Sequence, residues 1–238
     1  MTTRDTSGTK DSTALNKQAD GREIVHNLNG QRLGRKGLIT RQRILTVASK
    51  LIAEQDDLQI SLSSIAAEAS LGMTSLYNYF SDLTDVLLAL LEDVMVEAED
   101  AYLAQIRDRW DDEMLAHECR QFVNAFYSFW SKHANIFHLR NNYADKRDTK
   151  MITHRILAVQ RVLGFLNHQM DGVEGRDLGY TNSMASAAYM GIERAVSVLN
   201  NRHLMRDLPD AFRPNVAGLL AAEAQLLEFA IRTSRANR

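Results

Sequence analysis

Polar side chains between residues 73 and 79 have the types and the spacing needed to read nucleic-acid bases. Thr74 and Ser75 carry hydroxyls that can hydrogen-bond to base edges, and Asn78 carries an amide that can pair with adenine. Met73 and Tyr79 flank these three residues. The segment has no arginine, the side chain that most often contacts guanine, so a half-site containing A·T pairs is expected.

A helix-turn-helix is the arrangement that residues 61–80 predict, and it would hold these side chains outward. Ser61 can cap a first short helix, and Gly72 can cap a second one from Met73 to about Tyr79. Ala66 is small enough for the two helices to touch, and Leu76 returns from the second helix to lock their angle. That angle lets the second helix enter the major groove of DNA.

Contacts to the phosphate backbone require basic or hydroxyl side chains near this motif. Arg41 and Arg43 lie on a helix predicted to begin at Thr40, which is a plausible N-cap. Tyr77 offers a hydroxyl to a phosphate, although its ring, like Leu76 and Phe80, also suits the small core. Because residues 51–106 contain no Lys or Arg, we expect modest operator affinity that depends on the N-terminal arm.

The N-terminal arm is the most basic part of the chain. Residues 1–50 carry a net charge of +6 and the remainder −8. Such a distribution suggests a polyanionic partner at one end, but it also suits a solvated tail. Residues 1–37 hold five of the twelve glycines and little apolar periodicity, so they are predicted to be disordered. Within this arm, Arg35 and Lys36 could enter the minor groove.

Composition indicates one soluble, mostly helical protein. The chain of 238 residues has only two prolines, which favours long helices over a many-stranded sandwich. A single cysteine, Cys119, excludes an internal disulfide framework and a four-cysteine zinc site. No apolar run is long enough to span a membrane and no secretory signal is visible, so a cytoplasmic location is expected.

Apolar residues recur at helical spacing through the rest of the chain and predict an all-α fold. Helices are expected over about 40–55, 61–69, 73–79, 83–109, 112–132, 134–141, 149–170, 178–201 and 214–233. Strand-like alternation appears only as a weak hint at Leu58–Leu62.

The region from Thr40 to about Leu91 resembles the TetR/AcrR family of transcriptional regulators. The resemblance is carried by Ile65-Ala66-Ala67-Glu68-Ala69, by Leu76-Tyr77-Asn78-Tyr79-Phe80 and by Leu87-Leu88. It implies a basic arm (1–37), a three-helix DNA-binding domain (38–82) and a larger helical domain (83–238) that binds an effector and dimerises. It also implies a ligand-responsive repressor that binds a palindromic operator as a homodimer, with no cofactor.

Two positions depart from the family pattern. The turn has Ser70 where the family usually has glycine, so Ser70 is expected to adopt a less favoured backbone conformation. Leu83 stands where the family usually has a phosphate-binding lysine. Phosphate binding would then depend on the arm, on the two arginines of the first helix, on hydroxyls such as those of Tyr77 and Tyr79, and on the helix N-terminus at Ser81-Asp82. Asp82 and Asp85 oppose an anion at that N-terminus.

An aromatic stripe in the larger domain is a candidate effector pocket, although such stripes also form ordinary core. Phe122, Phe126 and Trp130 share one helical face. With the resemblance, they imply a cavity for a small apolar or aromatic effector, completed by Met95, Tyr102, Met151, His154 and Tyr189.

The last two helices are the expected dimer surface, again because of the resemblance. Ala185, Ala187, Ala188, Gly191 and Ala195 permit close helix approach on the first of them, and Leu219, Leu220, Ala224, Leu227 and Ile231 form an apolar stripe on the second. The two helices of each subunit would form a four-helix bundle, unless these faces are used inside the subunit.

An enzyme and a protein-binding adaptor are the alternatives. None of the seven histidines forms a metal-binding pair at helical spacing, and no phosphate-binding loop, nucleophile elbow or dinucleotide fingerprint occurs. We therefore expect no enzymatic activity, although the sequence leaves a dispersed Ser/His/Asp site open. An adaptor would leave the basic arm and residues 76–80 unexplained.

Overall fold

Helices make up all the regular elements of the described residues. The structure is a computed structural model and describes residues 32–54, 60–171 and 178–236. The elements are α1 (Arg35–Glu54), α2 (Leu62–Glu68), α3 (Met73–Tyr77), α4 (Leu83–Ala98), a π-helical turn (Glu99–Leu103), a 3-10 turn (Ala104–Ile106), α5 (Leu115–Lys132), α6 (Ala134–Asp145), α7 (Thr149–Gln169), α8 (Leu178–Leu199), α9 (Arg202–Asp207), a second 3-10 turn (Asp210–Phe212) and α10 (Val216–Ala236). The all-α prediction is confirmed for these residues.

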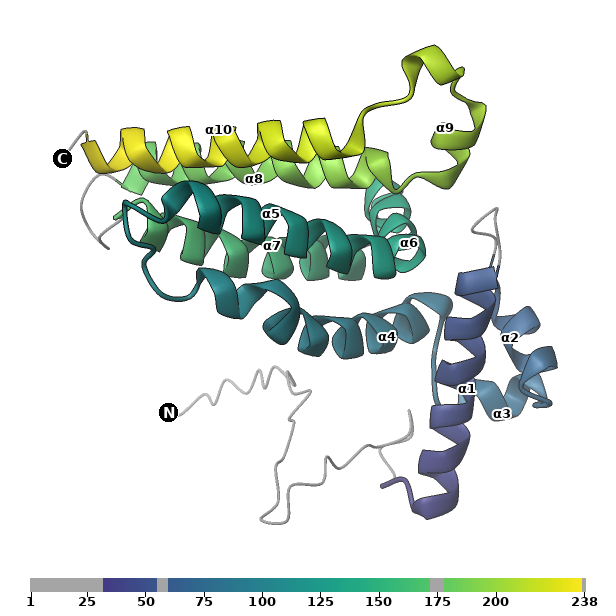
Figure 1. Cartoon of the computed structure of the whole chain (residues 1–238). Coiled ribbons are helices and arrows are strands. Elements are labelled where there is room, and N and C mark those ends of the chain that lie inside the picture. The colour runs from purple at the N-terminus through teal and green to yellow at the C-terminus, as the bar shows by residue number, and fades with distance from the viewer. Residues whose placement is uncertain (1–31, 55–59, 172–177, 237–238) are drawn as a thin grey trace, which may run out of the picture.

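The first three helices form a small unit, here called the head, at one end of the molecule (Figure 1). Its core is built from Ile44 and Ala48 of α1, Ile65 of α2 and Leu76 of α3, all of which are fully buried. These residues follow the helical period that the sequence showed, so burial of one apolar stripe per helix holds the head together.

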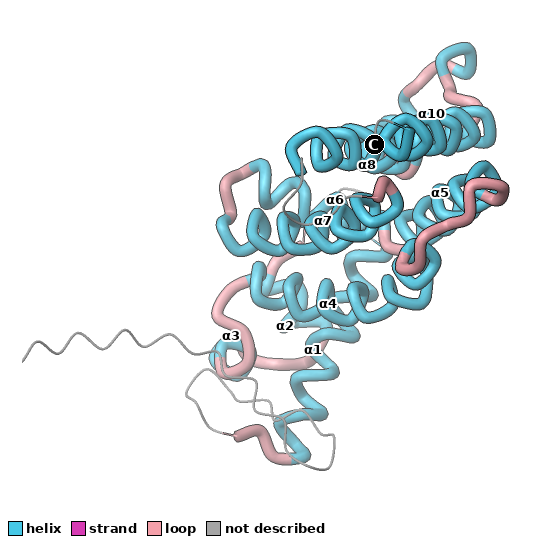
Figure 2. Tube along the Cα trace, turned by 90° about the vertical axis from the view of Figure 1, so that its left-hand side faces the viewer, coloured by secondary structure: helices cyan, strands magenta, loops and turns pink. Residues whose placement is uncertain are grey.

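Helices α5 to α10 form a larger unit, here called the body. In Figure 1 the long helices α5, α7, α8 and α10 run side by side, and Figure 2 shows their layering nearly end-on. Helix α10 packs against α5 and α8, while α6 packs against α7 at the end that faces the head. Helix α4 joins the two units, because it contacts both α1 and α7.

Helix α1 begins at Arg35, so the predicted start at Thr40 was wrong. Thr40 does not cap the helix; its Oγ1 donates to the Lys36 carbonyl oxygen within the helix, at 3.0 Å. Leu38 and Ile39 in these first turns are 41% and 60% exposed, so no buried stripe marked the extension. Residues 35–37 of the predicted disordered arm are therefore helical, and residues 1–31 lie outside the described residues.

The helix predicted over 83–109, here called the linking helix because it joins head and body, departs from α-helical geometry before its predicted end at Arg109. After Ala98 it continues as the π-helical turn and then the 3-10 turn. Tyr102, Leu103 and Ile106 in these turns are all buried. A π-turn adds a residue to the helical repeat, which rotates the following side chains and here is accompanied by burial of an aromatic and two aliphatic side chains.

Two further boundaries differ from the sequence prediction. Helix α3 ends at Tyr77 rather than about Tyr79, and α9, a short helix after Asn201, was not predicted. Asn201 caps α9 by accepting from the Leu204 N–H at 2.9 Å. No residue of α9 is buried, so apolar periodicity could not reveal it.

The apolar stripe of the last helix belongs to the core of its own subunit. Leu220, Ala224, Leu227 and Ile231 are at most 6% exposed in the single chain, because α10 packs against α5 and α8. The sequence-based assignment of this stripe to a dimer surface was therefore wrong. Hydrophobic periodicity identifies a buried face but does not say which element covers it.

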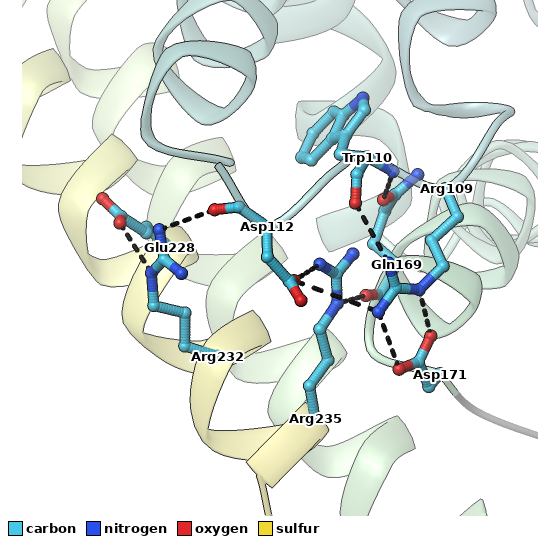
Figure 3. A network of polar contacts seen from close by, with 8 residues as sticks. All are labelled: Arg109, Trp110, Asp112, Gln169, Asp171, Glu228, Arg232 and Arg235. Carbon is cyan, nitrogen blue, oxygen red and sulfur yellow. Dashed lines mark hydrogen bonds and ion pairs between the residues drawn. The ribbon is translucent and has the colours of Figure 1, made fainter. Parts of the chain in front are cut away.

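A polar network closes the end of the body that lies away from the head (Figure 3). Gln169 at the end of α7 is fully buried. Its Oε1 accepts from the Trp110 N–H at 2.9 Å, and its Nε2 donates to the carbonyl oxygens of Ile106 and Asp108 at 3.0 and 2.7 Å. One side chain therefore satisfies three backbone groups of the irregular segment between the first 3-10 turn and α5.

Two arginines of α10 extend this network (Figure 3). Arg235 Nε donates to the Gln169 carbonyl oxygen at 2.8 Å, and Arg235 also pairs with Asp112. Arg232 donates to the Asp112 carbonyl oxygen at 3.1 Å. Arg109 forms an ion pair with Asp171 at 2.5 Å. The end of α10 is thus tied to both the start of α5 and the end of α7.

Candidate nucleic-acid interface

The turn between α2 and α3 has the geometry of a helix-turn-helix. Ser61 caps α2 through a reciprocal pair, in which its Oγ accepts from the Ser64 N–H at 3.1 Å and Ser64 Oγ accepts from the Ser61 N–H at 3.2 Å. The Leu71 N–H donates to the Ala66 carbonyl oxygen at 2.8 Å and closes the turn. Ser70 has a φ of 51°, in the left-handed region, which confirms that it adopts a less favoured backbone conformation.

Helix α3 is anchored through one side and exposes the other. Leu76 is fully buried, whereas Thr74, Ser75 and Asn78 are exposed and Tyr77 is 48% exposed. Gly72 caps the helix in an extended conformation, with φ −72° and ψ 149°, as predicted. The hydroxyls of Thr74 and Ser75 and the amide of Asn78 therefore share an outward-facing surface that polar atoms of a partner can reach.

Two flanking side chains contribute less to this surface than predicted. Met73 and Tyr79 are half-buried and pack against the core of the head. Phe80 is 3% exposed, and its ring lies under the Arg41 guanidinium, 5.2 Å from ring centroid to Cζ. This cation–π contact holds Arg41 beside the start of α4.

The predicted basic contacts all lie on α1. Arg35, Lys36 and Arg43 are exposed, whereas Arg41 is half-buried. Arg35 and Lys36 occupy the first turn of the helix rather than a flexible arm, because α1 starts at Arg35. The structure thus places both residues on a helix, and their entry into the minor groove stays a prediction.

The N-terminus of α4 is occupied by its own side chains and by a lysine from the body. Asp82 caps the helix by accepting from the Asp85 N–H at 2.8 Å. Lys150 Nζ, from the first turn of α7, lies 3.2 Å from Asp82 Oδ2 and 2.6 Å from Asp85 Oδ1. Thr84 Oγ1 donates to Asp148 Oδ2 at 2.7 Å beside this pair.

The positive charge of Lys150 offsets part of the negative charge that Asp82 and Asp85 bring to the N-terminus of α4. Burial raises the pKa of Asp85, but hydrogen bonds from Lys150 and Ser81 outweigh it and hold that pKa below its ordinary value. Asp85 therefore stays ionised at neutral pH. Sequence reasoning missed Lys150 because it lies 65 residues from Asp85, and no local pattern joins the two residues.

The residues of the predicted effector pocket largely gather in the middle of the body. The rings of Tyr102 and Phe126 meet edge to face with centroids 5.0 Å apart, and Phe122 and Tyr189 lie 6.2 and 6.0 Å from Phe126. Met151 is fully buried and Met95 half-buried. Trp130 packs instead with Phe137, at a centroid distance of 5.0 Å. The structure describes three hollows, and side chains other than those of the predicted effector pocket line them.

His154 adds an unsatisfied polar atom to this cluster. Among the described residues, nothing hydrogen-bonds to its buried Nδ1. Burial, aided by the nearby Arg140 charge, lowers the pKa of His154 to about 4. Arg140 is itself 5% exposed and lies 3.7 Å from Glu193. The centre of the body therefore combines aromatic rings with a few buried polar groups.

Two kinds of site are absent from the described part of the chain. Within it, His, Cys, Asp and Glu side chains form no group of three or more that could hold a metal ion. Nor does any helix described there combine the length and the apolar character needed to cross a membrane.

Solved structures with a similar arrangement are bacterial regulators. A TetR-like transcriptional regulator from Rhodococcus sp. RHA1 superposes with a TM-score of 0.52 at 18% identity, covering 87% of this chain and 100% of that chain. A TetR/AcrR-family regulator from Thermobifida fusca YX-ER1 gives a TM-score of 0.48 at 16% identity, covering 79% and 96%. A TetR-family regulator from Streptomyces coelicolor A3 gives 0.44 at 17%, covering 84% and 99%.

At the sequence level, neither family models nor curated proteins match the chain. The fold assignment therefore depends on the Rhodococcus structure, whose whole length is covered. The head, the linking helix and the helical body described above occur together in one superposition. The chain thus has the fold of a TetR-like transcriptional regulator, and the resemblance of its sequence to the TetR/AcrR family extends to the tertiary structure.

Proposed function

We propose that the chain is a DNA-binding transcriptional regulator, a ligand-responsive repressor that binds a palindromic operator as a homodimer. The observation that supports this most is the division of α3: Leu76 is fully buried, while Thr74 and Ser75 on the same short helix and Asn78 at its C-cap are exposed. A helix anchored in this way can present its polar side chains to base edges in the major groove.

Phosphate contacts in this proposal come from α1 and from the hydroxyls near the motif. Arg35, Lys36 and Arg43 are exposed on α1, and Ser61 and Tyr77 offer exposed hydroxyls. The N-terminus of α4 contributes little, because Asp82 and Asp85 already occupy it. Affinity therefore depends on few charges, and the salt dependence of binding should be correspondingly moderate.

The dimer surface in this proposal is the outer face of α8 and α10. Met190, Leu226 and Phe229 are 65%, 60% and 66% exposed in the single chain. Ala187 and Ala222 beside them are exposed as well, so the backbones of two subunits can approach closely. Exposed apolar side chains on two adjacent helices are the composition expected of a helical interface between identical subunits.

The effector in this proposal is a small apolar or aromatic molecule held among the rings of Tyr102, Phe122, Phe126 and Tyr189. These rings, and the unpartnered Nδ1 of His154, resemble the lining of a small-molecule site. A ligand with one polar group that bonds Nδ1, as donor or acceptor according to the ring tautomer, would satisfy His154, since a buried polar atom without a partner is costly.

Selection of DNA duplexes from a random pool, followed by fluorescence anisotropy over a salt series, tests DNA recognition. We expect Asn78→Ala to reduce the preference for the selected duplex by about 1–3 kcal/mol, the usual value of one good base contact. Arg43→Gln should weaken binding to all duplexes by a similar factor. It should also reduce the slope of log affinity against log salt concentration by about one. Asn124→Ala, at a residue that is exposed on α5, is the control. An unchanged sequence preference in Asn78→Ala would show that α3 is not the reading helix.

Sedimentation equilibrium tests the proposed dimer. The paired substitution Leu226→Glu and Phe229→Glu should convert a dimer to a monomer, because it places charges in an apolar contact. Val96→Glu is the matched control, since Val96 is 76% exposed on α4, away from α8 and α10. A paired variant that sediments as the unsubstituted chain does would refute this interface.

A further inference from the structure

A polar hollow lies at the end of the body that faces the head. It is enclosed by α6, α7, α8 and the start of α9, and its volume is about 530 Å³. Figure 1 shows α6 and α9 at this end. The volume is within the range of small-molecule sites, about 300–1,000 Å³. Its lining is rich in asparagine and arginine and differs in kind from the aromatic cluster in the middle of the body.

The charges around this hollow are not balanced. Its two carboxylates already have cationic partners: Asp145 lies 3.5 Å from Arg155, and Glu193 lies 3.7 Å from the buried Arg140. Arg194 and Arg202 also line the hollow and are exposed. Within residues 32–54, 60–171 and 178–236, no carboxylate pairs with either of them. Two guanidinium groups therefore remain uncompensated at one concave site.

We propose that this hollow binds a small polar anion that carries carboxylate or phosphate groups. Guanidinium groups bind the paired oxygens of carboxylates and phosphates through two parallel hydrogen bonds. The asparagine amides of the lining can donate to further oxygens of the same ligand. The site is separate from the aromatic cluster assigned above to an apolar effector.

The same hollow touches the connection between body and head. Asn135 and Arg202 line it and also line a second hollow of about 460 Å³ between α1, α4 and α6. Asn135 Nδ2 donates to the Ile52 carbonyl oxygen at 2.8 Å. Ile52 lies in the last turn of α1, where carbonyl groups have no partner within the helix, so the body caps the head.

An anion at Arg202 competes for the Asn135 amide. If the amide turns toward the anion, the Ile52 carbonyl loses its partner and the end of α1 is released from the body. Anion binding and the position of the head are then coupled, and any effect on DNA binding depends on the function proposed above.

Isothermal titration of the full chain with citrate and with inorganic phosphate, at constant ionic strength set by chloride, tests the site. We expect at least one probe to bind, and Arg194→Gln and Arg202→Gln each to weaken it by about tenfold, as loss of a charged hydrogen bond does. Lys146→Gln removes the same charge from a residue outside the lining and should leave the dissociation constant within about twofold. Binding of citrate alone assigns the site to carboxylates, and binding of phosphate alone assigns it to phosphates.

Three outcomes would overturn the proposal. The first is that neither probe binds. The second is that both arginine variants keep the affinity of the unsubstituted chain. The third is that Lys146→Gln weakens binding as much as the two arginine variants do. A change of sedimentation in Arg194→Gln without a change in anion affinity would place that arginine in a subunit interface instead. Both arginines are exposed, so far-UV circular dichroism should show folded variants.

Hydrogen exchange of α1 tests the connection to the head separately from DNA binding. Saturation with the bound probe should speed exchange in the last turn of α1, and Asn135→Ala should show the fast rate with or without the probe. Lys146→Gln, at a residue outside the lining, should keep the response. If the probe does not change the exchange rate in α1, anion binding is not coupled to the contact between α1 and the body, even if the anion binds.

Discussion

The two ends of the body satisfy their polar groups in opposite ways. At the end away from the head, Gln169 bonds three backbone groups, and Arg109 and Arg235 have carboxylate partners. At the end that faces the head, the lining of two hollows includes Arg202, which has no carboxylate partner among the described residues. Polar groups that bond one another stiffen the segments they join, although the buried Arg235 Nη2 has no partner among the described residues, whereas unpaired groups around a hollow leave room for a ligand and for movement.

The two ends of the body also differ in what they contact. The closed end holds the irregular segment that leads into α5 against the end of α10 (Figure 3). At the open end, the Asn135 amide contacts the end of α1, and Lys150 contacts the start of α4. If the function proposed above is right, movement between head and body would arise at the open end, where two hollows adjoin Arg202 and Asn135.

The largest expected effect is at the closed end. Gln169→Ala leaves the Trp110 N–H and the carbonyl groups of Ile106 and Asp108 without their partner. Each unsatisfied buried group costs about 1–3 kcal/mol, so we expect unfolding to require at least about 3 kcal/mol less free energy. Denaturant titration followed by circular dichroism measures it. Gln160→Ala, exposed on the same helix, should leave the midpoint unchanged. Equal midpoints for both variants would mean that the network does not stabilise this end.

A smaller effect is expected from acid, through His154 in the first turns of α7. Its folded pKa of about 4 lies below the ordinary 6.5, so the unfolded chain binds the proton more tightly. Its contribution to stability is therefore complete above pH 6.5 and is lost as the pH falls from 6.5 to about 4. His133 and His138, whose pKa values burial also lowers, act in the same direction.

Comparison of unfolding free energies at several pH values checks this expectation. His154→Asn should flatten the pH dependence between pH 6.5 and 4, because asparagine does not titrate there. Hydrogen exchange at pH 5 should show faster opening near His154 than in the segment that Gln169 holds. If His154→Asn leaves the pH dependence of the unfolding free energy unchanged, protonation of His154 does not contribute to the difference in stability between the two ends.

The smallest effect is expected for the ion pairs that link Lys150 to Asp82 and Asp85. Lys150 is 48% exposed, and surface pairs of this kind contribute about 0–1 kcal/mol. Lys150→Gln should lower the unfolding free energy by no more than this amount, and added salt should shrink the difference. Lys146→Gln is the control for the loss of one charge. A loss well beyond that range would show that this tie, rather than Asn135, dominates the open end.

Local sequence rules predicted the head well. The cap at Ser61, the left-handed Ser70, the cap at Gly72 and the burial of Leu76 all depend on residues within one turn or one short helix. Steric limits on the backbone and the spacing of one apolar face determine such features without reference to the rest of the chain. The start of α1 was misplaced because, as far as the structure describes the chain, its first turns hold no buried side chain and so leave no apolar pattern.

Tertiary structure decided which distant residues meet. Periodicity marked the stripe Leu220–Ile231 as buried, but only packing of α10 on α5 and α8 assigned it to the subunit core. Likewise, Lys150 reaches Asp85 across 65 residues, and Asn135 reaches Ile52 across 83. The sequence by itself determined most of the helices, their apolar faces and the outward polar side chains at 74, 75 and 78, because those follow from local sterics and helical spacing. Polar partners between helices depend on how the helices pack, and no local pattern encodes that arrangement.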